Sequence, residues 1–491
     1  MPTGRTVVRD AAVLTADPAN TVHQHGTLVI EDGRLAEVRP SEPDDGGQPA
    51  DTVIHGRGKL ALPGLVNAHT HLEMTGVQGA FSDLSTLRLG MEATALFRRS
   101  EAYAELARAG WALGLVNMLT SGITLFNSMD RDPRPGADAV AESGMRAVMG
   151  PMLADLMLPE PVEAQVAQAE EFVAAYHGSA DGRVRAAVAT QGDLWCTGEL
   201  WRAAAALARR HPEARVHTHV LETGQSQAMA RSQGYASSVE LLEELGLLDE
   251  RTMVAHFVNA RAADVRRVAA AGASVLHCPT GLAYYGTGER AWPPMRALAE
   301  HGVAVGLGLD DPYWIDSWDL FREAKQARVM ANHHFGAPQL DSDRLVRMLT
   351  IDGARALGLG DEVGSLEPGK QADVVLADID HPRFEPYTNL PALAVNALTA
   401  DRVESVLVEG RVLVSGGRVQ TLDKGAARDD LRRTAHEIAE KTGWHLGPAS
   451  AIPPRITGTI RRSAGPLLGI AARVATQTTR ERLRRGPGAD T

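Results

Sequence analysis

Eight short apolar segments, separated by longer stretches of helical character, restrict the fold of this 491-residue chain more than any other feature. They are residues 62–69, 122–129, 146–153, 184–190, 215–222, 252–258, 273–279 and 303–310. Such alternation indicates parallel strands joined by helical crossovers. Eight nearly continuous apolar strands, buried on both faces, are what a closed parallel barrel needs. The expected fold class is therefore α/β, with a (β/α)8 TIM barrel at its centre.

Both ends of the chain carry strand-like segments outside these eight. The N-terminal segments alternate apolar and polar residues around Asp32-Gly33, a dipeptide typical of a tight hairpin, and the segments after the barrel repeat this style. We therefore expect a discontinuous β-sandwich domain built from residues 1–62 and 361–425. It would flank a barrel of residues 63–360.

Residues 426–491 are expected to form a C-terminal helix followed by an arginine-rich tail. From residue 454 onward, eight Arg stand against one Glu and one Asp. Such a run is usually a solvated or self-docked extension, and contact with an anionic surface or nucleic acid is the alternative interpretation.

Composition narrows the class of protein. A formal net charge of −11 argues against nucleic acid as the main partner. No apolar stretch approaches the roughly 18 to 20 residues that a membrane span needs, and the N-terminus lacks a secretory pattern. Two cysteines, Cys196 and Cys278, are too few for a disulfide framework and are interpreted as small buried residues. We expect a cytoplasmic protein with a small heterocyclic molecule as substrate and no nucleic-acid or membrane partner. A homo-oligomer is compatible with the sequence.

Two histidines, His69 and His71, end the first apolar segment. Residues i and i+2 of a strand project to the same side, so both imidazoles can reach one ion beyond the strand's end. A third histidine, His219, and a carboxylate, Asp310, stand near the ends of the fifth and eighth segments, where barrel enzymes carry their chemistry. This mixed nitrogen and oxygen set predicts one divalent metal ion per chain, zinc first, with iron or manganese as alternatives.

Two further residues near these strand ends are candidates for acid–base chemistry. A divalent ion lowers the pKa of bound water toward neutrality and supplies hydroxide at pH 7, which makes hydrolysis the natural reaction. Glu222, three residues after His219, is the candidate proton shuttle, and His256 is the candidate group that orients the attacked atom or the hydroxide. His217 is expected to pack one layer deeper in the barrel. His277 is left open between a site role and a core role.

Five motifs, in this order and at these intervals, resemble the amidohydrolase superfamily: PGLVNAHTHLEMT, HTHVLET, VAHFV, HCPTG and VGLGLDD. Within the superfamily they are most similar to the mononuclear deaminase and chlorohydrolase group, which includes cytosine, guanine, adenosine-derivative and triazine hydrolases. The resemblance extends from about residue 5 to 420. It implies a metal bound by His69, His71, His219 and Asp310. It also implies that Glu222 and His256 match the family's acid–base and substrate-orienting positions, and that Asp310 accepts the proton of the metal-bound water.

The absence of lysine supports the mononuclear group. Binuclear relatives bridge two metals with a carboxylated lysine at the fourth strand end, and this chain has no Lys between His71 and Asp310. Hydantoinase-like, dihydroorotase-like and urease-like interpretations are therefore disfavoured.

Departures from the family pattern lie where substrate is selected. After the fourth strand, many relatives read PHAPYTCS and this chain reads TQGDLWCT, so that Gln191 replaces a substrate-contacting histidine. After Asp310, relatives often read DGSASND and this chain reads DDPYWID, which introduces Asp311 and Trp314. Tyr284 in the preceding loop, like Trp314, could stack on a planar ring. These four residues are the predicted substrate contacts, and they make nucleoside-type recognition less expected.

The sequence therefore predicts a metal-dependent hydrolase acting on a C–N bond of a planar nitrogen heterocycle, specifically a deaminase that releases ammonia. One alternative is a related enzyme that expels alkylamine or chloride or cleaves an amide. The other is a barrel that keeps these residues but serves as a binding or assembly protein.

Overall fold

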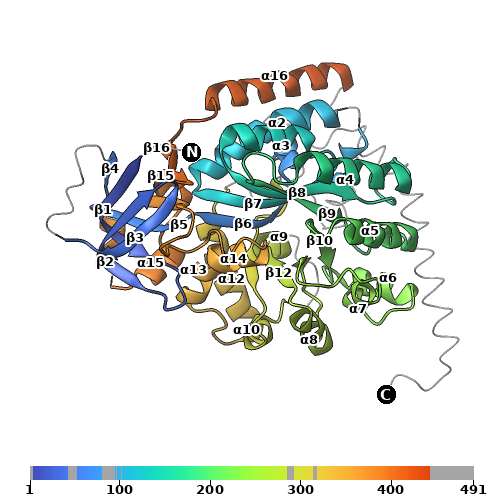
Figure 1. The fold of residues 1–491 in the computed structure, drawn as a ribbon. Coiled ribbons are helices and arrows are strands. Elements are labelled where there is room, and N and C mark those ends of the chain that lie inside the picture. Colours follow the sequence, from blue (N-terminus) through green and yellow to red (C-terminus); the bar gives the residue numbers. More distant parts are fainter. Residues whose placement is uncertain are drawn as a thin grey trace.

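The computed structural model describes residues 4–42, 52–79, 94–95, 97–100, 102–284, 292–312, 318–386 and 388–442. Eight parallel strands follow one another in chain order around a barrel (Figure 1). They are β6 (Leu65–Thr70), β7 (Ile123–Asp130), β8 (Arg146–Leu153), β9 (Val184–Thr190), β10 (Arg215–Val220), β11 (Thr252–His256), β12 (Ser274–His277) and β13 (Val305–Leu307). Each one falls within a predicted apolar segment or extends it by a single residue, and the expected barrel is confirmed.

The first and last strands meet through a single parallel bridge between Thr70 and Asp310. The N–H of Asp310 donates to the carbonyl of His69 at 2.9 Å. Glycine makes this approach possible, because a Cβ at Gly308 would lie only 2.8 Å from the backbone nitrogen of His69. Closure of the barrel therefore brings together two of the predicted metal ligands from opposite ends of its sequence.

Helices cover the outside of the barrel (Figure 1). They are η1 (Leu72–Val77), α2 (Tyr103–Thr120), α3 (Arg134–Ser143), α4 (Val162–Tyr176), α5 (Gly198–Arg210), α6 (Gly224–Ser232), α7 (Ser238–Glu244), α8 (Ala262–Ala270), α9 (Pro279–Tyr284), α10 (Met295–Glu300), α12 (Leu320–Phe335), α13 (Ser342–Leu349) and α14 (Ile351–Ala356). Large side chains such as Trp111 and Trp201 fill the outer layer, and smaller ones such as Val66, Ala68 and Ala187 share the inner core. Burial on both faces explains why the strands are almost wholly apolar.

A second, mainly antiparallel sheet joins both ends of the chain. Its strands are β1 (Arg5–Leu14), β2 (Val22–Glu31), β3 (Arg34–Pro40), β4 (Thr52–His55), β5 (Lys59–Pro63), β14 (Val374–Asp378), β15 (Val403–Val408), β16 (Arg411–Ser415) and β17 (Arg418–Val419). The predicted hairpin at Asp32-Gly33 is present, with φ of 48° and 79°. The carbonyl of Gly33, in the turn before β3, accepts a hydrogen bond from the N–H of Ala372, just before β14, at 2.9 Å. Because β2, β1 and β5 stand between β3 and β14 in the strand order, this contact shows that the sheet curls back on itself. The expected β unit built from both chain ends is thus present.

Three shorter elements, η2 (Pro382–Phe384), α15 (Leu390–Asn396) and η3 (Ala400–Arg402), connect β14 to β15. The sheet is fixed to the barrel by Arg146 at the start of β8, which forms a buried ion pair with Asp373 (2.8 Å) and a partly exposed one with Glu409 (3.1 Å).

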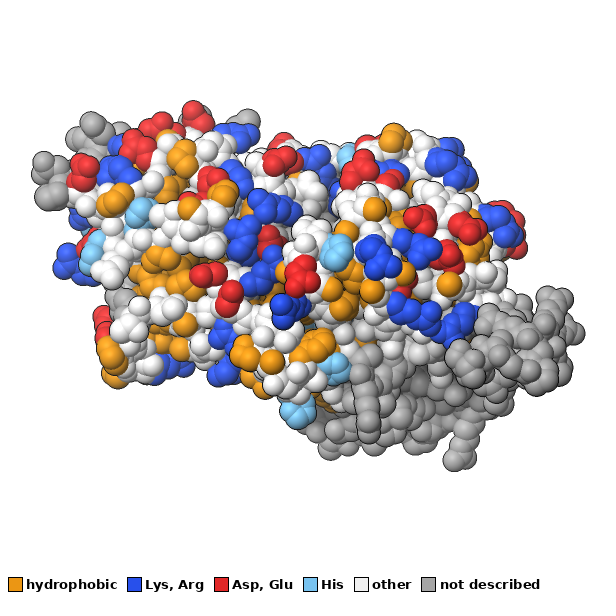
Figure 2. Space-filling model, turned by 90° about the horizontal axis from the view of Figure 1, so that it is seen from below, with side chains coloured by type: hydrophobic (Ala, Val, Ile, Leu, Met, Phe, Trp, Pro, Cys, Tyr) orange, Lys and Arg blue, Asp and Glu red, His pale blue; other side chains and the backbone are white. Residues whose placement is uncertain are grey.

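Helix α16 (Lys424–Thr442) lies along α2 on the outside of the barrel (Figure 1). The arginine-rich tail predicted after it lies outside the described residues. Basic and acidic side chains are interspersed over the face drawn in Figure 2. No helix in the described part of the chain is long and apolar enough to cross a membrane.

Candidate active site

The four predicted metal ligands lie together at the C-terminal end of the barrel. His69 and His71 come from the end of β6, His219 from β10, and Asp310 follows β13. All four are nearly inaccessible to solvent, and the N–H of Asp310 is hydrogen-bonded to the carbonyl of His69 where the barrel closes.

The donor atoms of these residues lie close enough together to surround one ion. The Nε2 atom of His219 lies 3.2 Å from Nε2 of His69 and 3.3 Å from Nε2 of His71. Oδ1 of Asp310 lies 3.5 Å and 3.9 Å from the same two histidine nitrogens. Four ligands held tetrahedrally at about 2.0 to 2.1 Å from zinc would be separated by roughly 3.3 to 3.5 Å. The residues present therefore fit a small divalent ion.

The other ring nitrogens fix which atoms face this centre. Nδ1 of His71 donates to the carbonyl of Met129 at 2.6 Å, so a neutral His71 leaves its Nε2 without a proton. Burial lowers the pKa of His71 and of His219 well below the usual value, and the neighbouring histidines lower it further. Both rings are thus neutral, which is the form that binds a metal. Unprotonated nitrogens 3.3 Å apart repel each other unless a cation lies between them.

His217 packs beneath the ligands, as predicted, and also contacts one of them. Its Nε2 atom lies 2.9 Å from Nδ1 of His69, and Nδ2 of Asn127 lies 3.3 Å from both ring nitrogens of His217. If Nε2 of His69 binds the ion, Nδ1 of His69 is the donor in this contact. A deeper layer of hydrogen bonds therefore orients His69.

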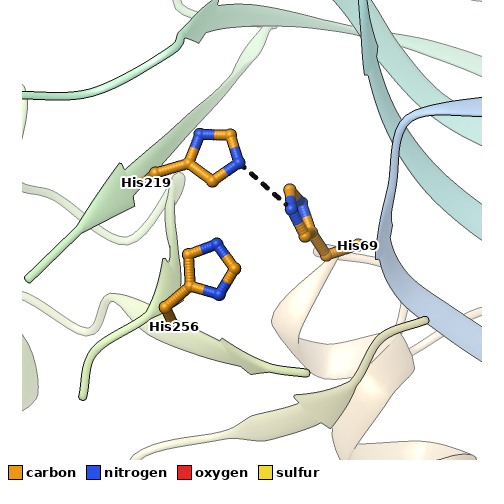
Figure 3. Close-up of side chains that lie close together, drawn as sticks. All are labelled: His69, His219 and His256. Carbon is orange, nitrogen blue, oxygen red and sulfur yellow. Dashed lines mark hydrogen bonds between the residues drawn. The ribbon is translucent and has the colours of Figure 1, made fainter. Parts of the chain in front are cut away.

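His256 shares the site with the predicted ligands (Figure 3). The ligand atoms of His69, His219 and His256 lie within 4.8 Å of one another, and so do those of His69, His71 and Asp310. His256 is the last residue of β11 and has a φ of 74°. This left-handed backbone breaks the regular alternation of side chains at the end of the strand. Burial lowers the pKa of His256 to about 4, so the ring is neutral near pH 7.

Glu222 stands at the edge of the site. Its Oε1 atom lies 3.8 Å from Nε2 of His256, and its side chain is 15% exposed, more than any of the four predicted ligands. The two predicted acid–base residues are therefore neighbours, with the carboxylate on the side nearer to solvent.

The predicted substrate contacts differ in where they lie. Gln191 and Asp311 are buried beyond the ends of β9 and β13, and Oε1 of Gln191 and Oδ1 of Asp311 have no hydrogen-bond partner among the described residues. Tyr284 ends α9 and is 41% exposed. Trp314 lies outside the described residues. Two of the four predicted contacts are thus buried just past the ends of their strands.

A buried polar cluster after β6 was not predicted. Glu73 accepts a hydrogen bond from Nε of Arg98 at 2.6 Å and another from the Tyr103 hydroxyl, and its own N–H donates to Asp130 at 3.0 Å. Against the effect of burial, the charge of Glu73 raises the pKa of Arg98. This cluster fixes η1 immediately after His71. Its only sequence signal was the run of polar residues that ends β7.

Other histidines and the cysteines fall outside this centre or at its margin. His277 is fully buried and packs edge-on against Trp292, with ring centroids 5.1 Å apart. Cys196 and Cys278 are both buried and unpaired, as interpreted from the sequence. Cys278 comes close to His256 and Asp310, all three ligand atoms lying within 4.8 Å.

Comparison with known proteins relates the chain to deaminases. The sequence model of the amidohydrolase family matches residues 60–413. A 5'-deoxyadenosine deaminase of Methanothermobacter thermautotrophicus is 33% identical, over 84% of this chain and 95% of that protein. A 5-methylthioadenosine/S-adenosylhomocysteine deaminase of Moorella thermoacetica is 31% identical, over 88% of this chain and 100% of that protein.

Solved structures agree on the fold. A zinc-bound adenosine deaminase of Xanthomonas campestris superposes with a TM-score of 0.81 at 25% identity, covering 89% of this chain and 100% of that one. A zinc-bound atrazine chlorohydrolase of Arthrobacter aurescens gives a TM-score of 0.78 at 23% identity, covering 87% and 99%. The second likeness shows the shared architecture alone.

Proposed function

The chain belongs to the amidohydrolase family, and we propose that it removes the exocyclic amino group of an adenine-type ring as ammonia. The predicted family, barrel fold and class of activity, hydrolysis of a carbon–nitrogen bond by a deaminase, are confirmed. The choice of an adenine-type ring as the substrate goes beyond this class of activity. It is supported by relatives whose names are 5'-deoxyadenosine and 5-methylthioadenosine/S-adenosylhomocysteine deaminase.

One observation carries the catalytic part of the proposal. The histidine nitrogens and the Asp310 oxygen lie 3.2 to 3.9 Å apart, and the Glu222–His256 pair lies beside them. His69, His71, His219 and Asp310 would hold one divalent ion, zinc first. Such an ion supplies a nucleophile at neutral pH by lowering the pKa of water.

The residues around this centre would move and hold protons. Oδ1 of Asp310 lies 3.5 Å from Nε2 of His69 and 3.9 Å from Nε2 of His71, so a divalent ion held by these nitrogens would keep the pKa of this buried carboxyl group below its usual range. Asp310 is therefore an ionised acceptor. Glu222, on the more exposed side, would carry a proton to the leaving amino group, and neutral His256 would hydrogen-bond to the attacked carbon's new oxygen.

Two buried acceptors favour a substrate with N–H donors. Oε1 of Gln191 and Oδ1 of Asp311 lack partners among the residues the structure describes. A buried polar atom without a partner is costly, so a ligand that supplies donors there would gain affinity. The exocyclic amino group of an aminopurine is such a donor. The relatives' names and these acceptors together shift the expectation back toward nucleoside-type substrates.

A substrate panel on protein of measured metal content tests the proposal. The panel holds 5'-deoxyadenosine, 5'-methylthioadenosine, adenosine, guanine, cytosine, and triazines that carry alkylamino or chloro groups. We expect about one tightly bound divalent ion per chain, as a single closed ligand set requires, and fastest ammonia release from the adenine-containing compounds. Zinc-loaded protein that releases only alkylamine or chloride would contradict the deaminase proposal. Two tightly held ions per chain would contradict the mononuclear site.

A further inference from the structure

The seam that closes the barrel lacks a regular ladder of backbone hydrogen bonds. Every other neighbouring pair of the eight strands is in register over three or more residues. In the described part of the chain, β6 and β13 meet only in the isolated bridge between Thr70 and Asp310. His69 and His71 lie on one side of this seam and Asp310 on the other. Contacts other than a ladder must therefore hold the carboxylate beside the two histidines.

Side chains of β6 supply such contacts. The hydroxyl of Thr70 donates to the carbonyl of Asp310 at 2.8 Å, and the N–H of Leu309 donates to Oδ1 of Asn67 at 2.9 Å. The N–H of Asp310 donates to the carbonyl of His69. Two successive residues after β13 are thus held to β6 by three hydrogen bonds, two of which use side chains.

The backbone of Asp310 needs support of this kind. Its φ of 63° lies in the left-handed region, which residues with a Cβ seldom occupy, although aspartate does so more often than most. Such a backbone persists only where the surroundings hold it. Both the N–H and the carbonyl of Asp310 are bonded to β6. The direction of the carboxylate follows from this backbone, and its Oδ1 atom lies 3.5 Å and 3.9 Å from Nε2 of His69 and His71.

The burial of Asn67 indicates that its contact with Leu309 matters. Asn67 and Thr70 are both 0% exposed in an otherwise largely apolar strand, where a polar atom without a partner costs free energy. Only the oxygen of the Asn67 amide can accept from the Leu309 N–H, and Nδ2 has no partner among the described residues. An apolar residue at this position would leave no such donor unpaired. The acceptor for Leu309 is therefore what the amide contributes.

We propose that Thr70 and Asn67 are positioning residues for Asp310: through the carbonyl of Asp310 and the N–H of Leu309, they hold the carboxylate where it can share one divalent ion with His69 and His71. The inference rests on the proposed metal site and is independent of the substrate. It gives the residue between the two metal-binding histidines a task of its own.

The chain offers matched variants for Thr70. Thr70→Val keeps almost the same shape and cannot donate a hydrogen bond, whereas Thr70→Ser keeps the hydroxyl. Thr350 provides the control, because it is also 0% exposed and its hydroxyl donates to one backbone carbonyl, that of Val346 in α13, at 2.7 Å. Thr350→Val removes the same kind of hydrogen bond at the end of a helix, so it reports the general cost of losing a buried hydroxyl.

The first test follows the two backbone amides by hydrogen–deuterium exchange of the full chain, with its metal content measured. Thr70→Val should accelerate exchange at Asp310, and Asn67→Ala should accelerate it at Leu309, both in the peptide that spans residues 303–312. Thr350→Val should leave this peptide unchanged. No substrate is needed, so the result does not depend on the proposed reaction. Unchanged exchange at both amides would overturn the proposal.

The second test measures zinc affinity by competition with a chromophoric chelator. Thr70→Val should bind zinc about 10- to 100-fold more weakly than the wild type, as expected when a residue that orients a ligand is lost. Thr70→Ser should recover most of this affinity, and Thr350→Val should lose none. An equal loss in Thr70→Ser and Thr70→Val would contradict the role given to the hydroxyl. Asn67→Ala should also weaken zinc binding, and it replaces Thr70→Val if that variant folds poorly.

A double-mutant cycle then asks whether Thr70 acts through Asp310. In an Asp310→Ala background, Thr70→Val should weaken zinc binding by less than about twofold, because the group that it positions is already absent. Equal losses in both backgrounds would overturn the proposal and leave the metal site intact. An Asp310→Ala variant that binds zinc as tightly as the wild type would instead contradict the ligand set of the proposed function, and the positioning role with it.

Discussion

Nε2 of His217 lies 2.9 Å from Nδ1 of His69, on the side of the His69 ring that faces away from the other metal donors. A hydrogen bond there fixes the tautomer and the orientation of a ligating histidine and raises its basicity. His217→Leu removes this partner without removing a ligand. We expect zinc affinity to fall about 10- to 100-fold, measured by competition with a chromophoric chelator. His217→Gln, which keeps an acceptor, should lose less, and equal affinity in all three proteins would show that the contact is incidental.

Glu222→Gln should abolish turnover and spare the metal. The amide cannot carry a proton, and Glu222 lies next to His256 rather than among the predicted metal ligands. We expect kcat to fall at least about 100-fold, with zinc content unchanged by mass spectrometry. Glu243→Gln is the control, because Glu243 pairs with Arg267 on the exposed surface of α7. If Glu222→Gln instead lost its zinc, the residue would belong to the ligand set.

The metal donors could be predicted because the rules that place them are local. A buried strand predicts which side its residues face, and a parallel barrel gathers the strand ends at one edge. His69, His71, His219 and Asp310 obey these rules, and all four come together. Family motifs then related the set to deaminases, and that relation is confirmed.

Other parts of the site could not be predicted because they depend on broken alternation or on distant partners. Glu222 is predicted by its place just past the strand end and by the family motif, but strand periodicity alone puts its side chain on the wrong side, and the left-handed Leu221 reverses that. The hydrogen bond from Arg98 to Glu73 joins residues separated by 25 positions and by a segment without periodic pattern.

Gly308→Ala should damage the metal site through the backbone. A Cβ at this position would lie 2.8 Å from the nitrogen and 2.9 Å from the Cβ of His69, and neither atom can move without displacing β6. We expect loss of bound zinc and a lower Tm, seen by mass spectrometry and calorimetry. Gly198→Ala at the start of α5 meets only the flexible end of Arg202 at 3.4 Å and should be neutral. Full zinc content in Gly308→Ala would show that the strands can separate freely.

Asp311→Ala tests whether Asp311 binds a hydrogen-bond donor of the substrate. Its Oδ1 atom is buried without a partner among the described residues, and removing it would leave a substrate donor unpaired, at a cost of about 1 to 3 kcal/mol. At about 1.4 kcal/mol per decade, kcat/KM should fall roughly ten- to a hundredfold with zinc retained. A lower Tm together with an unchanged kcat/KM would instead make Asp311 a structural residue of the β13 end.

Glu323 should make the stability of the protein depend on pH near neutrality. It is 3% exposed on α12 and accepts hydrogen bonds from the N–H (2.7 Å) and the hydroxyl (2.6 Å) of Thr280. Burial raises its pKa from about 4.5 to about 7; the Thr280 hydrogen bonds oppose this, and the charges of Asp310 and Asp319 add to it. A raised folded-state pKa means that the stabilising contribution is complete below about pH 4.5. It is lost as pH rises through 7, where the folded protein must ionise a buried carboxyl group.

Glu323→Gln isolates this effect, because all other groups titrate equally in both proteins. The glutamine keeps an acceptor for the Thr280 N–H and cannot ionise. The difference in unfolding free energy, variant minus wild type, should therefore rise between pH 5 and pH 8.5, by up to about 3 kcal/mol at 1.36 kcal/mol per pKa unit. Thermal unfolding at the two pH values measures it, and Glu300→Gln, exposed beside Arg296, should show no such change. A difference that is the same at both pH values would mean that Glu323 ionises in the folded protein as it does in water.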